Sequence, residues 1–127
     1  MRLIRAITSV RLHLLLAGLF GAAGVGLWAY AVHAGQASAA IAAQMLLIHA
    51  AALAGLSAAR RAGLLPERAG GIAITALACG AALFAGDLAL RALAGVRLFP
   101  MASPLGGVTM MASWLAIGLL GALKRGG

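Results

Sequence analysis

The sequence predicts an all-α integral membrane protein in which four transmembrane helices form an antiparallel bundle. Of its 127 residues, 64% are hydrophobic and 9% are charged, and the mean hydropathy is +1.06. A soluble domain is roughly half apolar and a quarter charged, so a bilayer is the expected solvent. Four apolar runs also reach the length of about 20 residues that a helix needs to cross a bilayer. We therefore expect residues 1–127 to form a single transmembrane domain.

The predicted spans follow one another with short connections. They are expected at residues 12–33, 39–59, 71–92 and 104–123. Uninterrupted runs of this kind exclude the alternating strands of a membrane β-barrel, which are about 10 residues long. The last span is expected to begin at Ser103 and Pro104, because a serine hydroxyl caps free N–H groups and proline suits the first helical position.

The first span has a second interpretation, as the apolar part of a cleaved signal peptide. Basic residues precede it, and the small residues Ala37, Ser38 and Ala39 follow it. The apolar run is nevertheless longer than the roughly 7 to 15 residues of a signal peptide. This length favours a retained membrane anchor.

The distribution of Lys and Arg predicts the orientation of the bundle. Eight of the ten cationic residues fall on one side, namely Arg2, Arg5, Arg11, Arg60, Arg61, Arg68, Lys124 and Arg125. The other side carries Arg91 and Arg97. Because short loops rich in Lys and Arg stay in the cytoplasm, we expect both termini there. The cationic side should attract anionic lipid headgroups.

The net charge of +8 does not by itself predict a nucleic-acid partner. Proteins that bind nucleic acids gather Lys and Arg on a soluble face, often with aromatic side chains that stack on bases. Here the cations lie at the ends of apolar runs. The sequence also lacks a nucleophile and base pair, a phosphate-binding loop and a dinucleotide motif. We therefore expect no enzyme, no cofactor and no nucleic-acid partner.

Small residues at every fourth position predict where helices approach closely. The first span contains Gly18, Ala22 and Gly26, and the third contains Ala78, Ala82 and Gly86. Such stripes let helix backbones come together in a bilayer. In a chain with 18 glycines, a stripe can equally arise by coincidence of composition.

A polar cluster is predicted toward the outer side of the bundle. Asp87 is the only acid in a predicted span, and Arg91 lies one helical turn later, where it can pair with it. Gln44 and His33 fall at a similar depth in the second and first spans. The cluster of His33, Gln44, Asp87 and Arg91 has two interpretations. It locks the register of the helices, or it is a site for a proton or a ligand.

His49 lies near the middle of the second span. A histidine at this depth either makes an interhelical hydrogen bond, which we favour, or relays a proton. Trp114 also lies mid-span, so we expect it to pack within the bundle. His13, His33 and His49 fall at different depths, and we therefore predict no metal site.

From Leu83 onward the sequence resembles a family of small bacterial membrane proteins known as domain of unknown function 423. The segment from Leu83 to Leu88 is similar to the family's Leu-Phe-Ser-Gly-Ser-Leu, and the segment from Ser103 to Gly107 is similar to its Thr-Pro-x-Gly-Gly. The matching positions are Phe84, Gly86, Arg97, Pro104, Gly106, Gly107 and Trp114. The resemblance implies four helices in the inner membrane and no established activity.

The resemblance extends to about Leu15, because His33 and His49 are similar to the family's histidines in the first two helices. Three positions depart from the family pattern. Met45 and Leu46 stand where the family has Tyr-Gln, and Asp87 stands where it has its second serine. The role of that serine is therefore not transferred to Asp87.

Two functions are compatible with these patterns. The first is a structural or accessory protein that packs with itself or with a larger membrane complex, which the apolar spans and short loops favour. The alternative is a small oligomeric transporter or proton-coupled permease that uses Asp87, Arg91 and His49. Four short helices enclose a transport path only as an oligomer.

Overall fold

The structure, a computed structural model, describes residues 1–124, and all of its regular elements are helices. Within that range five helices follow one another: α1 (Arg2–Ile7), α2 (Val10–Ala34), α3 (Ala37–Arg61), α4 (Glu67–Ala94) and α5 (Ala102–Leu123). The four long helices are apolar and long enough to cross a membrane. Each contains its predicted span and begins two to four residues before it. Arg125, counted above among the cations of the cytoplasmic side, lies outside the described residues.

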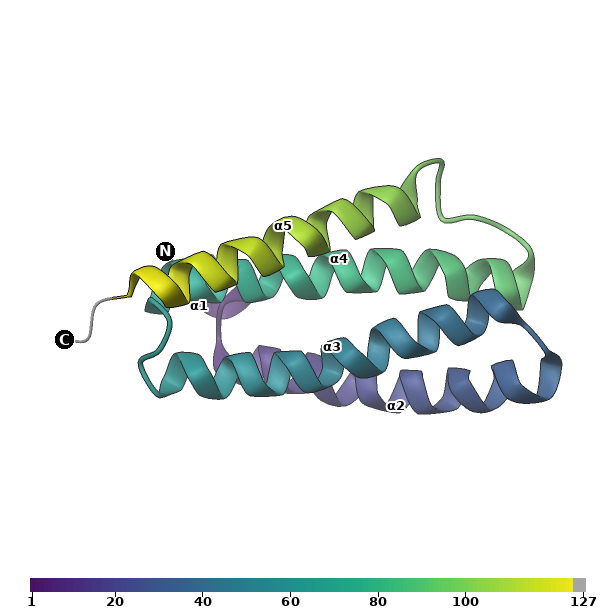
Figure 1. Cartoon of the computed structure of the whole chain (residues 1–127), viewed down its shortest axis with the longest axis horizontal. Helices are drawn as coiled ribbons and strands as arrows, with labels where there is room; N and C mark the ends of the chain where they lie inside the picture. The colour runs from purple at the N-terminus through teal and green to yellow at the C-terminus, as the bar shows by residue number, and fades with distance from the viewer. Residues whose placement is uncertain (125–127) are drawn as a thin grey trace.

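The long helices run antiparallel to one another in chain order (Figure 1). α2 packs on α3, α3 on α4 and α4 on α5, and α4 is the most buried of the four. One end of the molecule holds α1, the connection between α3 and α4, and the last residue of α5 (Figure 1). We call this the basic end. The opposite end, the far end, holds the connection between α2 and α3 and the loop of residues 95–101.

The helix boundaries follow from local backbone chemistry. Gly35 and Gly95 end α2 and α4 in the left-handed conformation that glycine adopts without a Cβ penalty. The start of α5 differs from its prediction, because α5 begins at Ala102 and its N-cap residue is Met101. Ser103 is therefore not the cap, and its hydroxyl is bonded to another helix, as described below.

Two glycines bring α4 and α5 into backbone contact. A Cβ on Gly106 would lie 2.6 Å from the backbone nitrogen of Phe84 and 2.7 Å from the carbonyl oxygen of Gly80. A Cβ on Gly80 would in turn lie 3.0 Å from the carbonyl oxygen of Gly106. Helices that approach this closely gain dispersion contacts between their backbones. The close packing of α4 on α5 therefore requires glycine at both positions.

The small-residue stripe predicted in the first span is wrong as an internal contact. Within the described chain, a Cβ on Gly18 or Gly26 would meet no heavy atom within 4 Å, and Ala22 is exposed. Gly24 lies against α3 instead, where a Cβ would come within 2.7 Å of Leu47. A four-residue spacing shows that small residues share one face of a helix, but it does not show whether that face points into the bundle or away from it.

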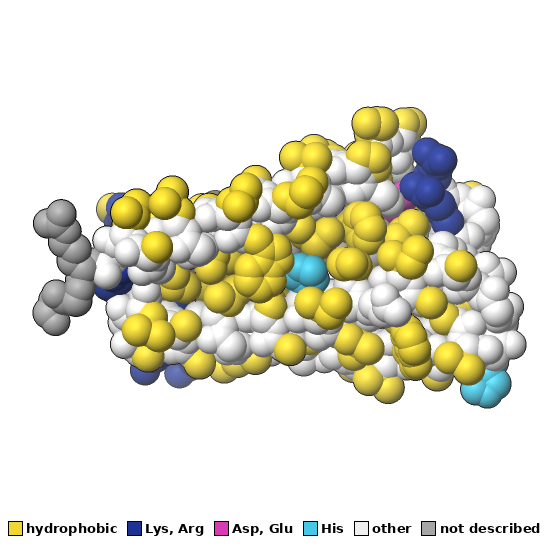
Figure 2. All heavy atoms as spheres, in the orientation of Figure 1, with side chains coloured by type: hydrophobic (Ala, Val, Ile, Leu, Met, Phe, Trp, Pro, Cys, Tyr) yellow, Lys and Arg dark blue, Asp and Glu magenta, His cyan; other side chains and the backbone are white. Residues whose placement is uncertain are grey.

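The surface of the bundle is apolar between its two ends. Hydrophobic side chains spread over the middle of the face in Figure 2, and Lys and Arg side chains gather at the two ends. Large exposed residues such as Leu15, Val25, Ile48 and Leu115 belong to this apolar surface. This distribution fits helices surrounded by hydrocarbon, with their charged ends in the headgroup regions.

We predict that Gly106→Ala destabilises the protein by about 1–3 kcal/mol, because the added methyl group forces two backbones apart. The matched control is Gly118→Ala in the same helix, where a Cβ meets open space. That change is expected to be neutral or slightly stabilising. Unfolding titrations of both variants in the same detergent measure the difference, and equal stability of the two would contradict the backbone contact.

Candidate functional site

Asp87 is a fully buried carboxylate that is bonded from three parts of the chain. Arg91, one turn later in α4, forms an ion pair with Oδ2. The hydroxyl of Ser103 in α5 donates to the same oxygen at 2.5 Å. The backbone N–H of Leu98, in the loop of residues 95–101, donates to Oδ1 at 2.9 Å. Both carboxylate oxygens are thus occupied by donors, which is what a buried charge requires.

These contacts join α4, the loop after it and the start of α5 at one point. The hydroxyl of Ser103 also lies 3.4 Å from the Arg91 guanidinium. Leu98 contributes its backbone N–H and also contacts α4, because a Cβ on Gly86 would lie 3.7 Å from its Cδ1. We call Asp87, Arg91, Leu98 and Ser103 the aspartate lock.

The aspartate lock differs from the predicted cluster in two of its members. The pairing of Asp87 with Arg91 is present, whereas His33 and Gln44 are both exposed. Nδ1 of His33 is bonded to the Ala29 carbonyl of its own helix at 2.8 Å. Within residues 1–124, neither His33 nor Gln44 makes a polar contact with Asp87 or Arg91. Similar depth in the bundle did not imply that the side chains face each other.

His49 and Trp114 form a polar contact between α3 and α5. Nδ1 of His49 lies 2.7 Å from the Met45 carbonyl oxygen, and Nε1 of Trp114 lies 3.3 Å from Nε2. A carbonyl only accepts and an indole N–H only donates, so His49 adopts the tautomer that carries its proton on Nδ1. The interhelical hydrogen bond favoured for His49 is therefore present, and Trp114 is its donor.

Three of the positions that resemble the family motif, Phe84, Gly106 and Gly107, lie where α4 and α5 meet. Phe84 and Gly106 meet at the backbone contact of α4 and α5, and a Cβ on Gly107 would lie 3.8 Å from the Phe84 ring. Arg97 and Pro104 are exposed, in the loop and in the first turn of α5. Phe84, Gly106 and Gly107 thus set how closely α5 approaches α4.

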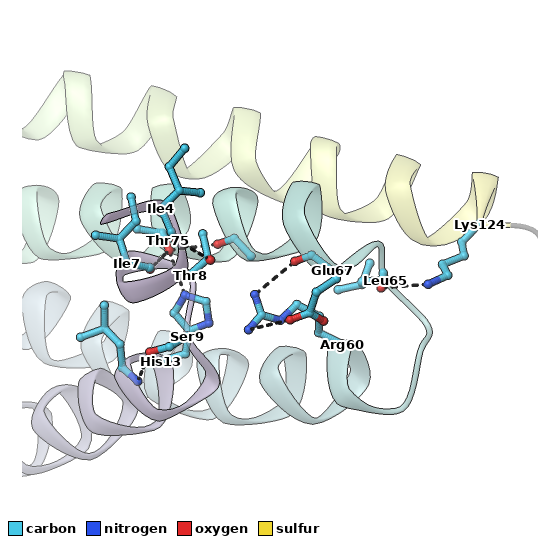
Figure 3. Close-up of polar contacts among 12 residues, drawn as sticks. Ile4, Ile7, Thr8, Ser9, His13, Arg60, Leu65, Glu67, Thr75 and Lys124 are labelled. Atoms are coloured by element: carbon cyan, nitrogen blue, oxygen red, sulfur yellow. Dashed lines mark hydrogen bonds and ion pairs between the residues drawn. The ribbon is translucent and has the colours of Figure 1, made fainter. Parts of the chain in front are cut away.

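A second polar group, at the basic end, was not predicted from the sequence (Figure 3). His13 is fully buried in α2, and its Nε2 lies 2.9 Å from the hydroxyl oxygen of Thr75 in α4. That hydroxyl lies 2.6 Å from the carbonyl of Ile7, the last residue of α1. Thr75 therefore connects α1, α2 and α4. Its hydrogen bonds to distant residues follow from the fold, so no sequence pattern signals them.

Arg60 is the other buried polar residue at the basic end. Its side chain is 1% exposed, and Nη2 lies 3.8 Å from a carboxylate oxygen of Glu67. The guanidinium lies against Gly71, where a Cβ would come within 2.0 Å of Nη1 and 2.7 Å of the Thr8 Cβ. Lys124 donates to the Leu65 carbonyl at 3.2 Å nearby (Figure 3). The α3–α4 connection is thereby tied to the end of α5.

The geometry of these groups favours structural contacts. The carboxylate of Asp87 and both ring nitrogens of His49 are engaged by neighbouring residues of the same chain. A group that transfers a proton or binds a substrate has to be reachable by that proton or substrate. The contacts of Asp87 and His49 therefore join α5 to α4 and to α3.

The family model described as "Protein of unknown function (DUF423)" matches residues 17–107 of the chain. The matched region includes the first three long helices for most of their length and the motif positions from Phe84 to Gly107, whereas Trp114 lies beyond it. No curated protein and no solved structure is similar enough to the chain to count as a match.

We predict that Asp87→Asn lowers the thermal unfolding midpoint on the order of ten degrees, because Arg91 loses its ionic partner in a buried site. Glu67→Gln is the matched control, since it removes the same charge from a carboxylate that is 79% exposed. It is expected to shift the midpoint little.

Adding Arg91→Met to the Asp87→Asn variant should restore part of the lost stability, because no unpaired charge is then left. Thermal melts of Asp87→Asn, Arg91→Met and the double variant in one detergent measure this coupling. Strictly additive effects of the two substitutions would show that the ion pair does not stabilise the fold.

Proposed function

The chain belongs to the family described as protein of unknown function (DUF423), and from this premise we propose that it is a structural or accessory membrane protein. In this role it packs with itself or with a larger membrane complex. The proposal includes no catalytic activity. It also places the protein in the inner membrane of a bacterium, as a multi-pass protein whose two termini face the cytoplasm.

The observation that carries the proposal is that buried polar groups bond to one another inside a mainly apolar bundle, whose outer surface is also apolar. Asp87, His49 and Ser103 make their polar contacts inside the bundle. The outward faces of the long helices carry large exposed hydrophobic residues. A surface of this kind offers contact area to lipid and to other transmembrane helices, and it offers few groups for chemistry.

Small exposed residues add to this support. Gly18, Ala22 and Gly26 lie on an outward face of α2, where neighbouring described residues leave space. In a bilayer, such a face lets a further helix approach its backbone closely. A stripe that has no role inside the bundle is thus available for a helix of another chain.

The proposed orientation is supported by where the cations lie. The basic end carries the arginines at the end of α3 and the start of α4 as well as those near the N-terminus, namely Arg2, Arg5, Arg11, Arg60, Arg61 and Arg68. At the far end Arg91 is paired with Asp87, which leaves Arg97 as the exposed cation there. The rule that Lys and Arg remain in the cytoplasm therefore assigns the basic end to that side.

The alternative function, a proton-coupled transporter, has less support from the same residues. Asp87 would have to release three donors before it could exchange a proton, and Arg91 would lose its partner at the same step. His49 is 4% exposed and is held by Trp114. Within residues 1–124 both side chains are buried.

We predict that the protein, expressed at its native level and purified in mild detergent, co-purifies with a second copy or with a stoichiometric partner. Its mass in the detergent complex, measured by light scattering, tests this directly. A monomer without any stoichiometric partner would count against the accessory role.

A variant tests where the contact lies. Ala22→Leu is expected to lower the yield of the co-purified copy or partner, because added bulk keeps a neighbouring helix away from α2. Gly118→Leu is the control, since it places the same side chain in open space on α5. An equal loss of partner in both variants would show that the stripe of α2 is not the contact.

A further inference from the structure

We propose that a cavity at the basic end binds a phosphate group, as carried by the headgroup of an acidic phospholipid or by a soluble phosphate compound. The cavity has a volume of about 490 Å³ and lies beside α1, between the starts of α2 and α4 and the end of α3. Its charged lining consists of Arg5, Arg11, Arg60, Arg61, Arg68 and Glu67. This inference goes beyond the proposed function, and its lipid source rests on the proposed placement in the membrane.

The charges around the cavity are strongly unbalanced. The sequence contains two acids, and one of them, Asp87, is paired with Arg91 at the far end. The other, Glu67, is 79% exposed and lies 3.8 Å from Arg60. A carboxylate that is mostly in solvent compensates a charge at this distance only weakly. Five guanidinium groups thus share one solvated carboxylate, and an anion in the cavity would reduce their mutual repulsion.

Arg60 is the buried group that marks the cavity as a binding site. It is 3% exposed, and among residues 1–124 its buried Nε has no hydrogen-bond partner. Nη1 reaches the Glu67 carbonyl at 3.4 Å, which is long for a bond from a charged donor, about 2.7–2.9 Å. A buried guanidinium is costly unless its charge is compensated. Gly71 makes room for it, so its position is set by the packing of α3 on α4.

Two helix N-termini also converge on the cavity. Ser9 and Arg11, at the start of α2, and Glu67 and Arg68, at the start of α4, are among its lining residues. The N-terminus of a helix carries partial positive charge and free N–H groups, which favour a bound anion. Arg11 and Arg68 add cations where the helix dipole is already positive. A phosphate group, with its negative charge and several acceptor oxygens, fits this surplus of donors.

The surroundings of the cavity favour a lipid as the source of the phosphate. Met1, Ile4 and Val10 contribute apolar lining next to the arginines. Leu3 and Ile7 of α1 are exposed hydrophobic residues at the same end. In the proposed placement α1 lies at the level of the lipid headgroups, where apolar side chains enter the membrane and Arg side chains meet lipid phosphates.

Lipid binding to the delipidated protein in neutral detergent tests the inference. The probes are phosphatidylglycerol, phosphatidylcholine and inorganic phosphate, and native mass spectrometry counts the bound molecules. We expect one phosphatidylglycerol per chain to be retained, at least about tenfold more tightly than phosphatidylcholine, whose choline cation opposes binding beside several arginines.

Two double variants locate the site. Arg5→Gln with Arg68→Gln removes two exposed cations of the cavity, and it should weaken phosphatidylglycerol binding roughly thirtyfold. Arg2→Gln with Arg97→Gln removes the same charge from residues outside the cavity lining. This control is expected to bind within about twofold of the unmodified protein. Because all four residues are exposed, both variants should fold.

The outcomes separate the two sources and can overturn the site. Selective retention of phosphatidylglycerol, lost in the cavity variant, supports a lipid headgroup. Binding of inorganic phosphate that displaces phosphatidylglycerol supports the same site with a soluble phosphate compound. Equal losses in the two double variants, or equal binding of phosphatidylglycerol and phosphatidylcholine with no binding of phosphate, would overturn the proposal. These outcomes are independent of whether a protein partner co-purifies.

Discussion

The arrangement of α4, the following loop and α5 depends on the hydrogen bonds and the ion pair of the buried Asp87 carboxylate. A carboxylate shielded from water is tolerated only where donors surround it. Its donors come from three places along the chain: Arg91 in α4, the Leu98 amide in the loop and the Ser103 hydroxyl in α5. Because all three have to reach one carboxylate, the start of α5 is positioned against α4. The close approach of Gly80 and Gly106 holds the same pair of helices further along.

The two ends of the molecule differ in how far their cations are neutralised by acids of the same chain. At the far end an arginine inside a long helix is neutralised by an acid of the same helix, and the resulting ion pair is used to fix a loop. At the basic end five arginines line one cavity with a single acid, and two helix N-termini add to the positive potential there. Anions from outside the chain would reduce the repulsion in such an arrangement. The same asymmetry supports the proposed orientation and the proposed phosphate site.

The ion pair predicted within one helix agrees with the structure, whereas the predicted cap of the last helix does not. Predictions that depend on two helices agree only in part. Asp87 and Arg91 pair because residues four apart lie on one face of a helix. Depth along the bundle placed Gln44 near Asp87, but depth does not determine which way a helix face points, and Gln44 is exposed. His49 required a partner because it is polar at mid-span. That the partner is Trp114 depends on how α5 crosses α3.

The sequence by itself determined the four long apolar helices, the family and the uneven distribution of charge, because hydropathy, motif spacing and helical periodicity are properties of contiguous residues. Only the tertiary structure decided that the Ser103 hydroxyl donates to Asp87. As a result, no side chain of the described residues caps the start of α5. The tertiary structure also decided that Thr75 joins α1 to α2, and that Arg60 is buried over Gly71. Each of these contacts joins residues on different helices. Their formation depends on the rotation and separation of those helices, which the packing of the whole bundle determines.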